Sequence, residues 1–221
     1  LRGMGAEIEG DDTSTLVIDG VSELAASHYS VMPDRIEAGT FLVAAAATRG
    51  RITVENANAE HLGIVLEKLR DAGVNVTVEG NTITADMTEG QLTSVDLITA
   101  PYPGFPTDMQ ATFTALNVVA EGVGRITETI FENRLMQAHE MSRMGANITV
   151  DGHSVIIRGK SSIDGAPVMA SDLRASASLV IAGLAAKGET HVDRIYHIDR
   201  GYERIEEKLQ AVGADIVRKS R

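Results

Sequence analysis

Apolar residues follow two helical patterns along the chain. In three stretches nearly every residue is small or apolar, which is typical of a helix buried on all sides; these are residues 38–47, 111–120 and 175–186. In three others Leu, Ile, Met and Val alternate with charged residues at helical spacing, which predicts one face in water; these are residues 60–70, 134–144 and 202–212. The two kinds of helix alternate along the chain.

Short segments with strand patterns fill the gaps between these helices. The first unit has predicted strands at residues 30–32, 51–55, 74–78 and 82–85, with counterparts later in the chain. Glycine-centred turns at residues 79–81 and 151–153 predict tight hairpins. Each unit therefore has the predicted order β-α-β-α-β-β.

Two sets of anchor residues show that this unit is repeated. Four segments combine a helix end, a glycine in the position of a left-handed helix cap and the start of a strand; their glycines, 68, 72 and 68 residues apart, are Gly5, Gly73, Gly145 and Gly213. Three aspartates each precede a buried stretch and lie 16 residues before a glycine; they are Asp34, Asp108 and Asp172. A spacing kept three times indicates one repeated structural unit.

Three such units pack most simply with the buried helices bundled together and the sheets and amphipathic helices outside. The sequence therefore predicts an α/β (α+β) fold, an inside-out α/β barrel of three β-α-β-α-β-β repeats around a pseudo-threefold axis. We expect one domain over residues 21–221, with repeats at about 21–87, 88–160 and 161–221. Residues 1–20 repeat only the end of a unit, so we expect them to be the tail of a preceding repeat or an interdomain segment. The chain, which begins with Leu1, is expected to be a fragment.

Composition narrows the range of partners. The formal net charge of −11 disfavours nucleic acid and anionic membranes as partners. No apolar run approaches the roughly 20 residues of a membrane-spanning helix. The absence of cysteine excludes disulfides and is compatible with a cytoplasmic location. The six histidines show neither HxH nor HExxH spacing, so we expect no metal site and no cofactor.

If the buried helices run parallel, their amino termini meet at one end of the bundle and favour anions there. Asp34 and Asp172 fit simple helix capping. Asp108 follows a stiff proline-rich segment at residues 101–106, so a role as general base or ligand is as plausible as capping.

Four arginines are predicted to gather at the same end: Arg35, Arg134, Arg174 and Arg200. Taken singly, each fits a surface ion pair of little strength. Taken together at repeat-equivalent positions, they suit a phosphate or carboxylate ligand.

Five stretches carry a resemblance to the enolpyruvyl transferase family; they are residues 32–46, 103–111, 128–135, 171–180 and 192–209. Within that family they resemble the branch that uses UDP-N-acetylglucosamine more than the shikimate-pathway branch. The resemblance implies transfer of the enolpyruvyl group of phosphoenolpyruvate to the sugar 3-hydroxyl with release of phosphate, the first committed step of peptidoglycan synthesis. A non-enzymatic anion-binding module and a shikimate-pathway transferase stay open as alternatives.

The resemblance also implies roles for individual residues. Asp108 would contact the sugar hydroxyl as the base, and Arg134, Arg174 and Arg200 would bind the carboxylate and phosphate of phosphoenolpyruvate. Ile130 would contribute a backbone contact to the sugar nucleotide, with Phe131 packing beside it. The general acid of the family lies on an amino-terminal domain that these residues do not include, so we expect this fragment to be inactive alone.

Overall fold

The computed structural model describes residues 1–11 and 13–219, and the chain divides into two units, Leu1–Pro33 and Asp34–Arg221. The first unit holds a 3₁₀ helix, Arg2–Met4, and an antiparallel hairpin of β1 (Glu7–Glu9) and β2 (Val17–Asp19). The predicted strand at residues 30–32 is wrong, because residues 20–34 form neither helix nor strand. A strand needs a pairing partner, and residues 30–32 have none. The assignment of residues 1–20 to a preceding repeat stays a prediction.

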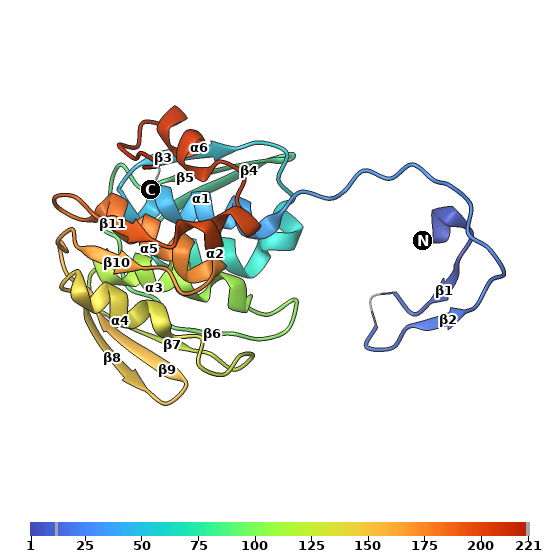
Figure 1. The fold of residues 1–221 in the computed structure, drawn as a ribbon, viewed down its shortest axis with the longest axis horizontal. Coiled ribbons are helices and arrows are strands. Elements are labelled where there is room, and N and C mark those ends of the chain that lie inside the picture. The colour runs from blue at the N-terminus through green and yellow to red at the C-terminus, as the bar shows by residue number, and fades with distance from the viewer. Residues whose placement is uncertain (12, 220–221) are drawn as a thin grey trace. The chain divides into compact units, whose positions relative to one another are not determined.

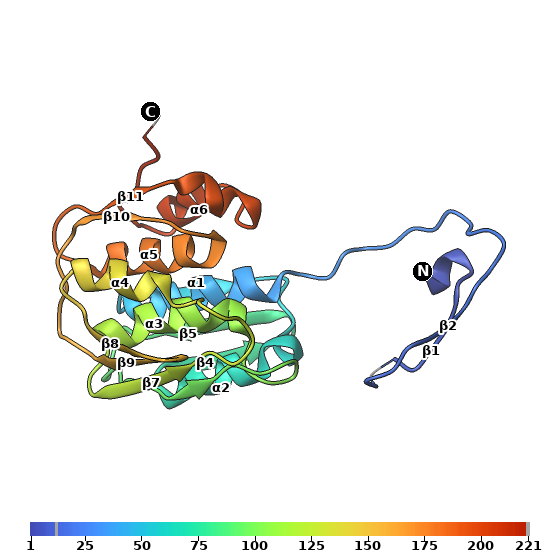
Figure 2. The ribbon, with the colours of Figure 1, turned by 60° about the horizontal axis from the view of Figure 1, so that its bottom comes forward.

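Three buried helices lie side by side in the middle of the second unit (Figures 1 and 2). They are α1 (Arg35–Ala47), α3 (Gln110–Val119) and α5 (Leu173–Ala185). Leu42, Leu116 and Leu179, one from each helix, are fully buried. The predicted inside-out arrangement is therefore confirmed.

The other three helices lie outside this bundle (Figure 2). They are α2 (Gly63–Asp71), α4 (Met136–Arg143) and α6 (Ile205–Ala211), and α2 is preceded by a 3₁₀ helix, Ala59–Leu62. Each buries one apolar face, for example through Leu69, Met141 and Leu209, and leaves its charged residues exposed or partly exposed. Among the described residues, no helix is long and apolar enough to cross a membrane.

Among the described residues of the second unit, the strands form three sheets around the bundle. The first has the order β3 (Arg51–Val54), β5 (Thr82–Asp86), β4 (Asn75–Glu79). The second has the order β6 (Leu97–Ile98), β7 (Val123–Thr127), β9 (Ser154–Arg158), β8 (Asn147–Asp151). The third contains only the parallel pair β10 (Pro167–Met169) and β11 (His191–Asp193). The first two sheets contain the predicted hairpins, with Gly80 and Gly152 in their turns.

The anchor residues act locally as predicted. The Asp34 carboxylate accepts a hydrogen bond from the Ile36 amide at 2.8 Å, and Asp172 accepts from the Arg174 and Ala175 amides at 2.8 and 3.0 Å. These bonds satisfy amides that the first turn of a helix leaves unpaired. The repeat glycines all have positive φ between 86° and 99°, which only glycine adopts without strain; they are Gly5, Gly73, Gly145 and Gly213.

The proline-rich segment before α3 is anchored in the core. The Ala100 amide donates to the Phe105 carbonyl at 2.9 Å, and the buried Phe105 ring meets Phe113 edge to face, with centroids 5.0 Å apart. The next residues form the 3₁₀ helix Thr107–Met109, whose Met109 is fully buried. Anchors on both sides therefore fix the position of Asp108 between them.

Candidate active site

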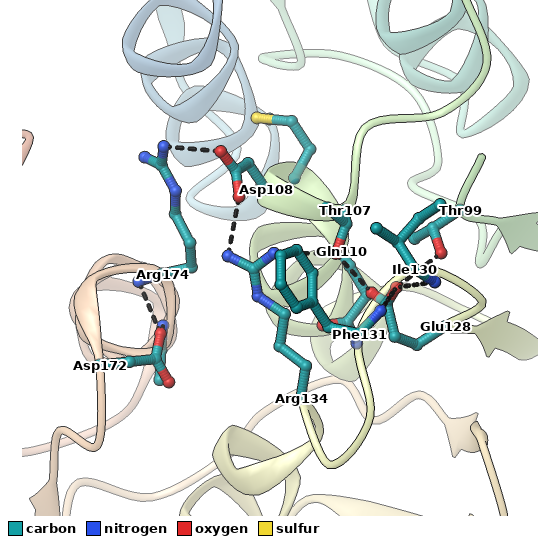
Figure 3. Close-up of polar contacts among 12 residues, drawn as sticks. Thr99, Thr107, Asp108, Gln110, Glu128, Ile130, Phe131, Arg134, Asp172 and Arg174 are labelled. Carbon is teal, nitrogen blue, oxygen red and sulfur yellow. Dashed lines mark hydrogen bonds and ion pairs between the residues drawn. The ribbon is translucent and has the colours of Figure 1, made fainter. Parts of the chain in front are cut away.

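Asp108 lies between two arginines from different parts of the chain (Figure 3). Its Oδ1 accepts a hydrogen bond from Arg134 NH2 at 2.7 Å, and its Oδ2 accepts from Arg174 NH2 at 2.8 Å. Arg174 lies in the first turn of α5, and Arg134 lies in the loop before α4. Because both carboxylate oxygens are used by arginines, Asp108 does not act as a helix cap.

The three charged side chains of this cluster are partly buried. The side chains of Arg174, Arg134 and Asp108 are 14, 21 and 35% exposed. Partial burial alone raises the pKa of the Asp108 carboxyl, but the attraction and hydrogen bonds of Arg174 and Arg134 outweigh it, so this pKa lies below its ordinary value. Asp108 is therefore ionised at neutral pH, and the three groups carry one net positive charge.

Tyr202 supports Arg174 from the core side. Its ring is 1% exposed, and its hydroxyl accepts from Arg174 NH1 at 3.3 Å while it exchanges a 2.9 Å hydrogen bond with Thr40 of α1. The guanidinium carbon of Arg174 lies 5.7 Å from the centroid of the Tyr202 ring. Arg174 is thus held from two sides, which limits the entropy that ligand binding would have to remove.

Glu128 connects the loops on the other side of the site. It follows β7, is 2% exposed, and accepts from Thr99 and Thr107 hydroxyls at 2.8 and 2.7 Å. It also accepts from the amides of Ile130 and Phe131 at 2.8 and 3.1 Å. The Thr107 hydroxyl in turn accepts from Arg134 NH1 at 2.9 Å. A continuous set of hydrogen bonds therefore runs from Glu128 through Thr107 and Arg134 to Asp108 (Figure 3).

The structure brings some of the predicted site residues together and not others. Phe131 is 54% exposed and its ring lies 4.9 Å from the Arg134 guanidinium carbon, while Ile130 is 39% exposed beside it. The Arg35 guanidinium lies 5.4 Å from the Tyr102 ring centroid. Arg200 ends the 3₁₀ helix Ile195–Arg200. Within residues 1–11 and 13–219, neither Arg35 nor Arg200 forms an ion pair, so both lie outside the Asp108 network.

Sequence analysis missed the residues that hold this network in place: Thr99, Thr107, Glu128 and Tyr202. Of these four residues, Tyr202 alone could have been suspected from its residue type, because a tyrosine buried in a predicted helix generally needs a hydrogen-bond partner. The Thr99–Glu128 and Arg174–Tyr202 contacts join positions 29 and 28 residues apart, and no local pattern reports them. No group of three or more His, Asp or Glu side chains in the described part of the chain is arranged to hold a metal ion.

The fold and the arginine–carboxylate cluster define a class of protein, a three-unit inside-out α/β barrel with Asp108 held between two arginines. The chain belongs to the EPSP synthase (3-phosphoshikimate 1-carboxyvinyltransferase) family, which matches residues 1–209. The predicted membership of the enolpyruvyl transferases is thereby confirmed.

Individual relatives agree with this assignment. The chain is 59% identical over 220 residues to UDP-N-acetylglucosamine 1-carboxyvinyltransferase of Coxiella burnetii, and it spans 51% of that relative's length. Its fold is similar to the enolpyruvyl transferase NikO from Streptomyces tendae, with 30% identity, a TM-score of 0.83, and coverage of 97% of this chain and 51% of that one. EPSP synthase from Acinetobacter baumannii is 19% identical with a TM-score of 0.73, covering 100% of this chain and 54% of that one, and supports the fold alone.

Proposed function

We propose that the protein containing this chain transfers the enolpyruvyl group of phosphoenolpyruvate to the 3-hydroxyl of UDP-N-acetylglucosamine and releases phosphate. One observation carries the proposal: Asp108, an ionised carboxylate, is held between Arg134 and Arg174. The name of the 59% identical relative supports this choice of substrates. Because the chain spans about half of such relatives, it supplies half of the site, with an amino-terminal domain as its partner.

Phosphoenolpyruvate carries two anionic groups that match the arginines. Guanidinium groups bind carboxylate and phosphate in a bidentate manner. Arg134 and Arg174 each use one NH2 group on Asp108, so a bound phosphate or carboxylate would compete for those donors. Arg35 and Arg200, unpaired with carboxylates in the described part of the chain, would supply further donors as the ligand binds.

The same competition prepares Asp108 for proton removal. Loss of the arginine contacts removes the interactions that lower its pKa, so substrate binding makes the carboxylate more basic. Asp108 then accepts the proton of the sugar 3-hydroxyl. The sugar oxygen adds to the enol carbon of phosphoenolpyruvate while the neighbouring methylene carbon takes up a proton from a general acid, which would come from outside these residues. The resulting methyl carbon then loses a proton, the carbon–carbon double bond re-forms, and the bond from the former enol carbon to the phosphate oxygen breaks, which releases phosphate.

Ile130 and Phe131 would contact the sugar nucleotide. The Ile130 amide already donates to Glu128 at 2.8 Å, which leaves the carbonyl as the backbone group of Ile130 without a hydrogen bond among the described residues. That carbonyl would accept a hydrogen bond from the nucleotide, while the exposed Phe131 ring offers an apolar face. The cytoplasmic location expected from the sequence fits soluble metabolites as substrates.

Asp108→Ala in the complete protein tests the proposal. We expect phosphate release to require both substrates and to fall by about 100-fold to 10,000-fold in the variant, the range typical of general-base assistance. Asp86→Asn, on the first sheet, is the matched control and should leave turnover unchanged. Unchanged turnover in Asp108→Ala would contradict the base assignment, whereas the absence of phosphate release from the unsubstituted complete protein would favour a simple anion-binding module.

A further inference from the structure

Tyr202 is a buried titratable residue that the proposed reaction does not use. It lies between the 3₁₀ helix Ile195–Arg200 and α6, and its side chain packs in one apolar cluster with Phe41 of α1 and Ala177 of α5. A phenylalanine would fill this space equally well, whereas a buried hydroxyl needs hydrogen-bond partners. The partners of the Tyr202 hydroxyl therefore indicate what this group does.

Thr40 fixes the direction of the hydrogen bond that it shares with Tyr202. The Thr40 hydroxyl has a single proton, and it donates this proton to the Ile36 carbonyl, one helical turn earlier, at 2.7 Å. In the 2.9 Å contact between Thr40 Oγ1 and the Tyr202 hydroxyl, the donor is therefore Tyr202. Burial raises the pKa of Tyr202, so its proton is present throughout the neutral range.

This arrangement leaves the Tyr202 oxygen as an acceptor for Arg174. Because the tyrosine proton points to Thr40, the oxygen offers its lone pairs to Arg174 NH1, which donates to it at 3.3 Å. The NH2 group of the same guanidinium donates to Asp108 Oδ2 at 2.8 Å. A guanidinium is planar and its nitrogens are rigidly spaced, so a bond to NH1 limits the directions in which NH2 can point.

The backbone that carries Tyr202 is itself held close to α5. The Tyr202 amide donates to the carbonyl of the buried Ile198 at 3.0 Å. A Cβ at Gly201 would lie 2.9 Å from the Leu173 side chain, so the chain passes close to the first turn of α5 at this point. Leu173 directly precedes Arg174. The fold therefore fixes where the Tyr202 hydroxyl lies relative to the start of α5.

We propose that Tyr202 and Thr40 are positioning residues that aim the NH2 group of Arg174 into the site. The inference rests on the proposed function, in which an anionic group of phosphoenolpyruvate replaces Asp108 on that NH2 group. The Tyr202 contact uses NH1, so it is kept when Asp108 is displaced. Tyr202 and Thr40 are 1% and 2% exposed, and they act through Arg174 without touching a substrate.

The repeat supplies a matched control for Thr40. Thr40 lies six residues after Asp34, and Ser178 lies six residues after Asp172, so the two occupy equivalent positions in α1 and α5. Both are buried and both donate to a backbone carbonyl, Ser178 to that of Ala175 at 2.8 Å. Among the described residues the Ser178 hydroxyl has no side-chain partner, so its removal costs the same kind of bond without reaching the site.

The first test measures the pKa of Asp108 by carbon NMR in the 221-residue chain without ligand. Arg174 is a main cause of the lowered pKa of Asp108, so a misplaced guanidinium should let this pKa rise toward its ordinary value. We expect that rise in Tyr202→Phe and, to a smaller extent, in Thr40→Val. Thr40→Ser, which keeps the hydroxyl, and Ser178→Ala should leave the pKa unchanged. A purely structural role would lower the melting temperature without moving this pKa.

The second test measures the kinetics of the complete protein. We expect the KM for phosphoenolpyruvate to rise about tenfold in Tyr202→Phe, the equivalent of one lost hydrogen bond, while the KM for UDP-N-acetylglucosamine changes less than about twofold. Thr40→Val added to Tyr202→Phe should cause no further rise, because both residues act through the same bond to Arg174. Thr40→Ser should keep the native values.

Two results would overturn the inference. One is a pKa of Asp108 that both Tyr202→Phe and Thr40→Val leave unchanged. The other is an equal rise in KM for the two substrates. A complete protein that releases no phosphate would contradict the proposed function instead, and the pKa of Asp108 would still decide the role of Tyr202 and Thr40.

Discussion

In the proposed function, Asp108 and the anionic groups of phosphoenolpyruvate would compete for the same arginine donors. The carboxylate accepts one hydrogen bond from each of Arg134 and Arg174. Under the proposal it would therefore act as an internal counter-ion that a phosphate has to displace. Binding and catalysis would make opposite demands on this residue, since its charge opposes anion binding but is needed to accept a proton.

Asp108→Asn in the 221-residue chain separates these two demands. We expect the affinity for inorganic phosphate to rise by about tenfold, because a neutral amide no longer repels the anion or holds both guanidinium groups as strongly. Chemical shifts followed by NMR during phosphate titration would measure the change, with Asp86→Asn as the control. Equal or weaker phosphate binding by Asp108→Asn would show that Asp108 does not compete with anions.

The lowered pKa of Asp108 also predicts how stability depends on pH. A carboxyl whose pKa falls on folding stabilises the folded state above its unfolded pKa of about 3.9, and this stabilisation is lost as the pH falls through the lower folded value. The melting temperatures of the native chain and Asp108→Asn should therefore differ most above about pH 5 and converge as the pH falls below about 4. A difference that stays constant over this range would contradict the assignment.

Glu128 is expected to position the site without touching a substrate. Glu128→Gln replaces one acceptor oxygen by an amide that can only donate, which leaves at least one of the four buried or partly buried donors poorly satisfied. We expect a loss of about 1–3 kcal/mol in the free energy of unfolding. In the complete protein, turnover should fall because Thr107 and Arg134 lose their fixed positions. Urea unfolding measures the first effect, and the exposed Glu79→Gln serves as control.

At the level of elements, local chemistry made much of the fold predictable. Capping by Asp34 and Asp172 and the left-handed glycines depend on neighbours within three residues, so they follow from spacing alone. The strand at residues 30–32 failed because pairing depends on a partner far along the chain. For the same reason no local sequence pattern indicated the Arg174–Tyr202 and Thr99–Glu128 contacts. Asp108 and the arginines, in contrast, were predictable from their positions in the repeat.

One close approach between elements gives a prediction about packing. A Cβ at Gly159, directly after β9, would lie 1.7 Å from the Ala120 carbonyl oxygen at the end of α3. Gly159→Ala must move β9 away from α3, so we expect a loss of about 1–3 kcal/mol in the free energy of unfolding. In α2, a Cβ at Gly63 would meet nothing within 4 Å. Gly63→Ala is the matched control and should gain up to about 1 kcal/mol from helix propensity. Equal stability of the two variants would rule out the tight contact.

At the level of the whole molecule, the repeat predicted three equivalent units, but the units are not equally complete. The first two have sheets of three and four strands, and the third has two. Equivalent sequence spacing indicates where a strand belongs, but a sheet forms only if its neighbouring strand is present. The proposed function makes the same demand on the site, because these residues would supply one side of it and the rest of the protein the facing side.

This half-built site leads to the last prediction, that the 221-residue chain binds anions but does not turn over. The Asp108 side chain is 35% exposed, so water reaches the carboxylate that must take up a proton. Catalysis of this kind depends on holding both reactants in one geometry and on excluding water. The rate enhancement from both effects is lost when half of the contacts are missing. We expect no phosphate release from phosphoenolpyruvate and UDP-N-acetylglucosamine above the uncatalysed rate. Adding the remaining half of the protein as a separate chain should restore release if the two halves associate. Release by the 221 residues alone would mean that these residues already contain the whole catalytic set.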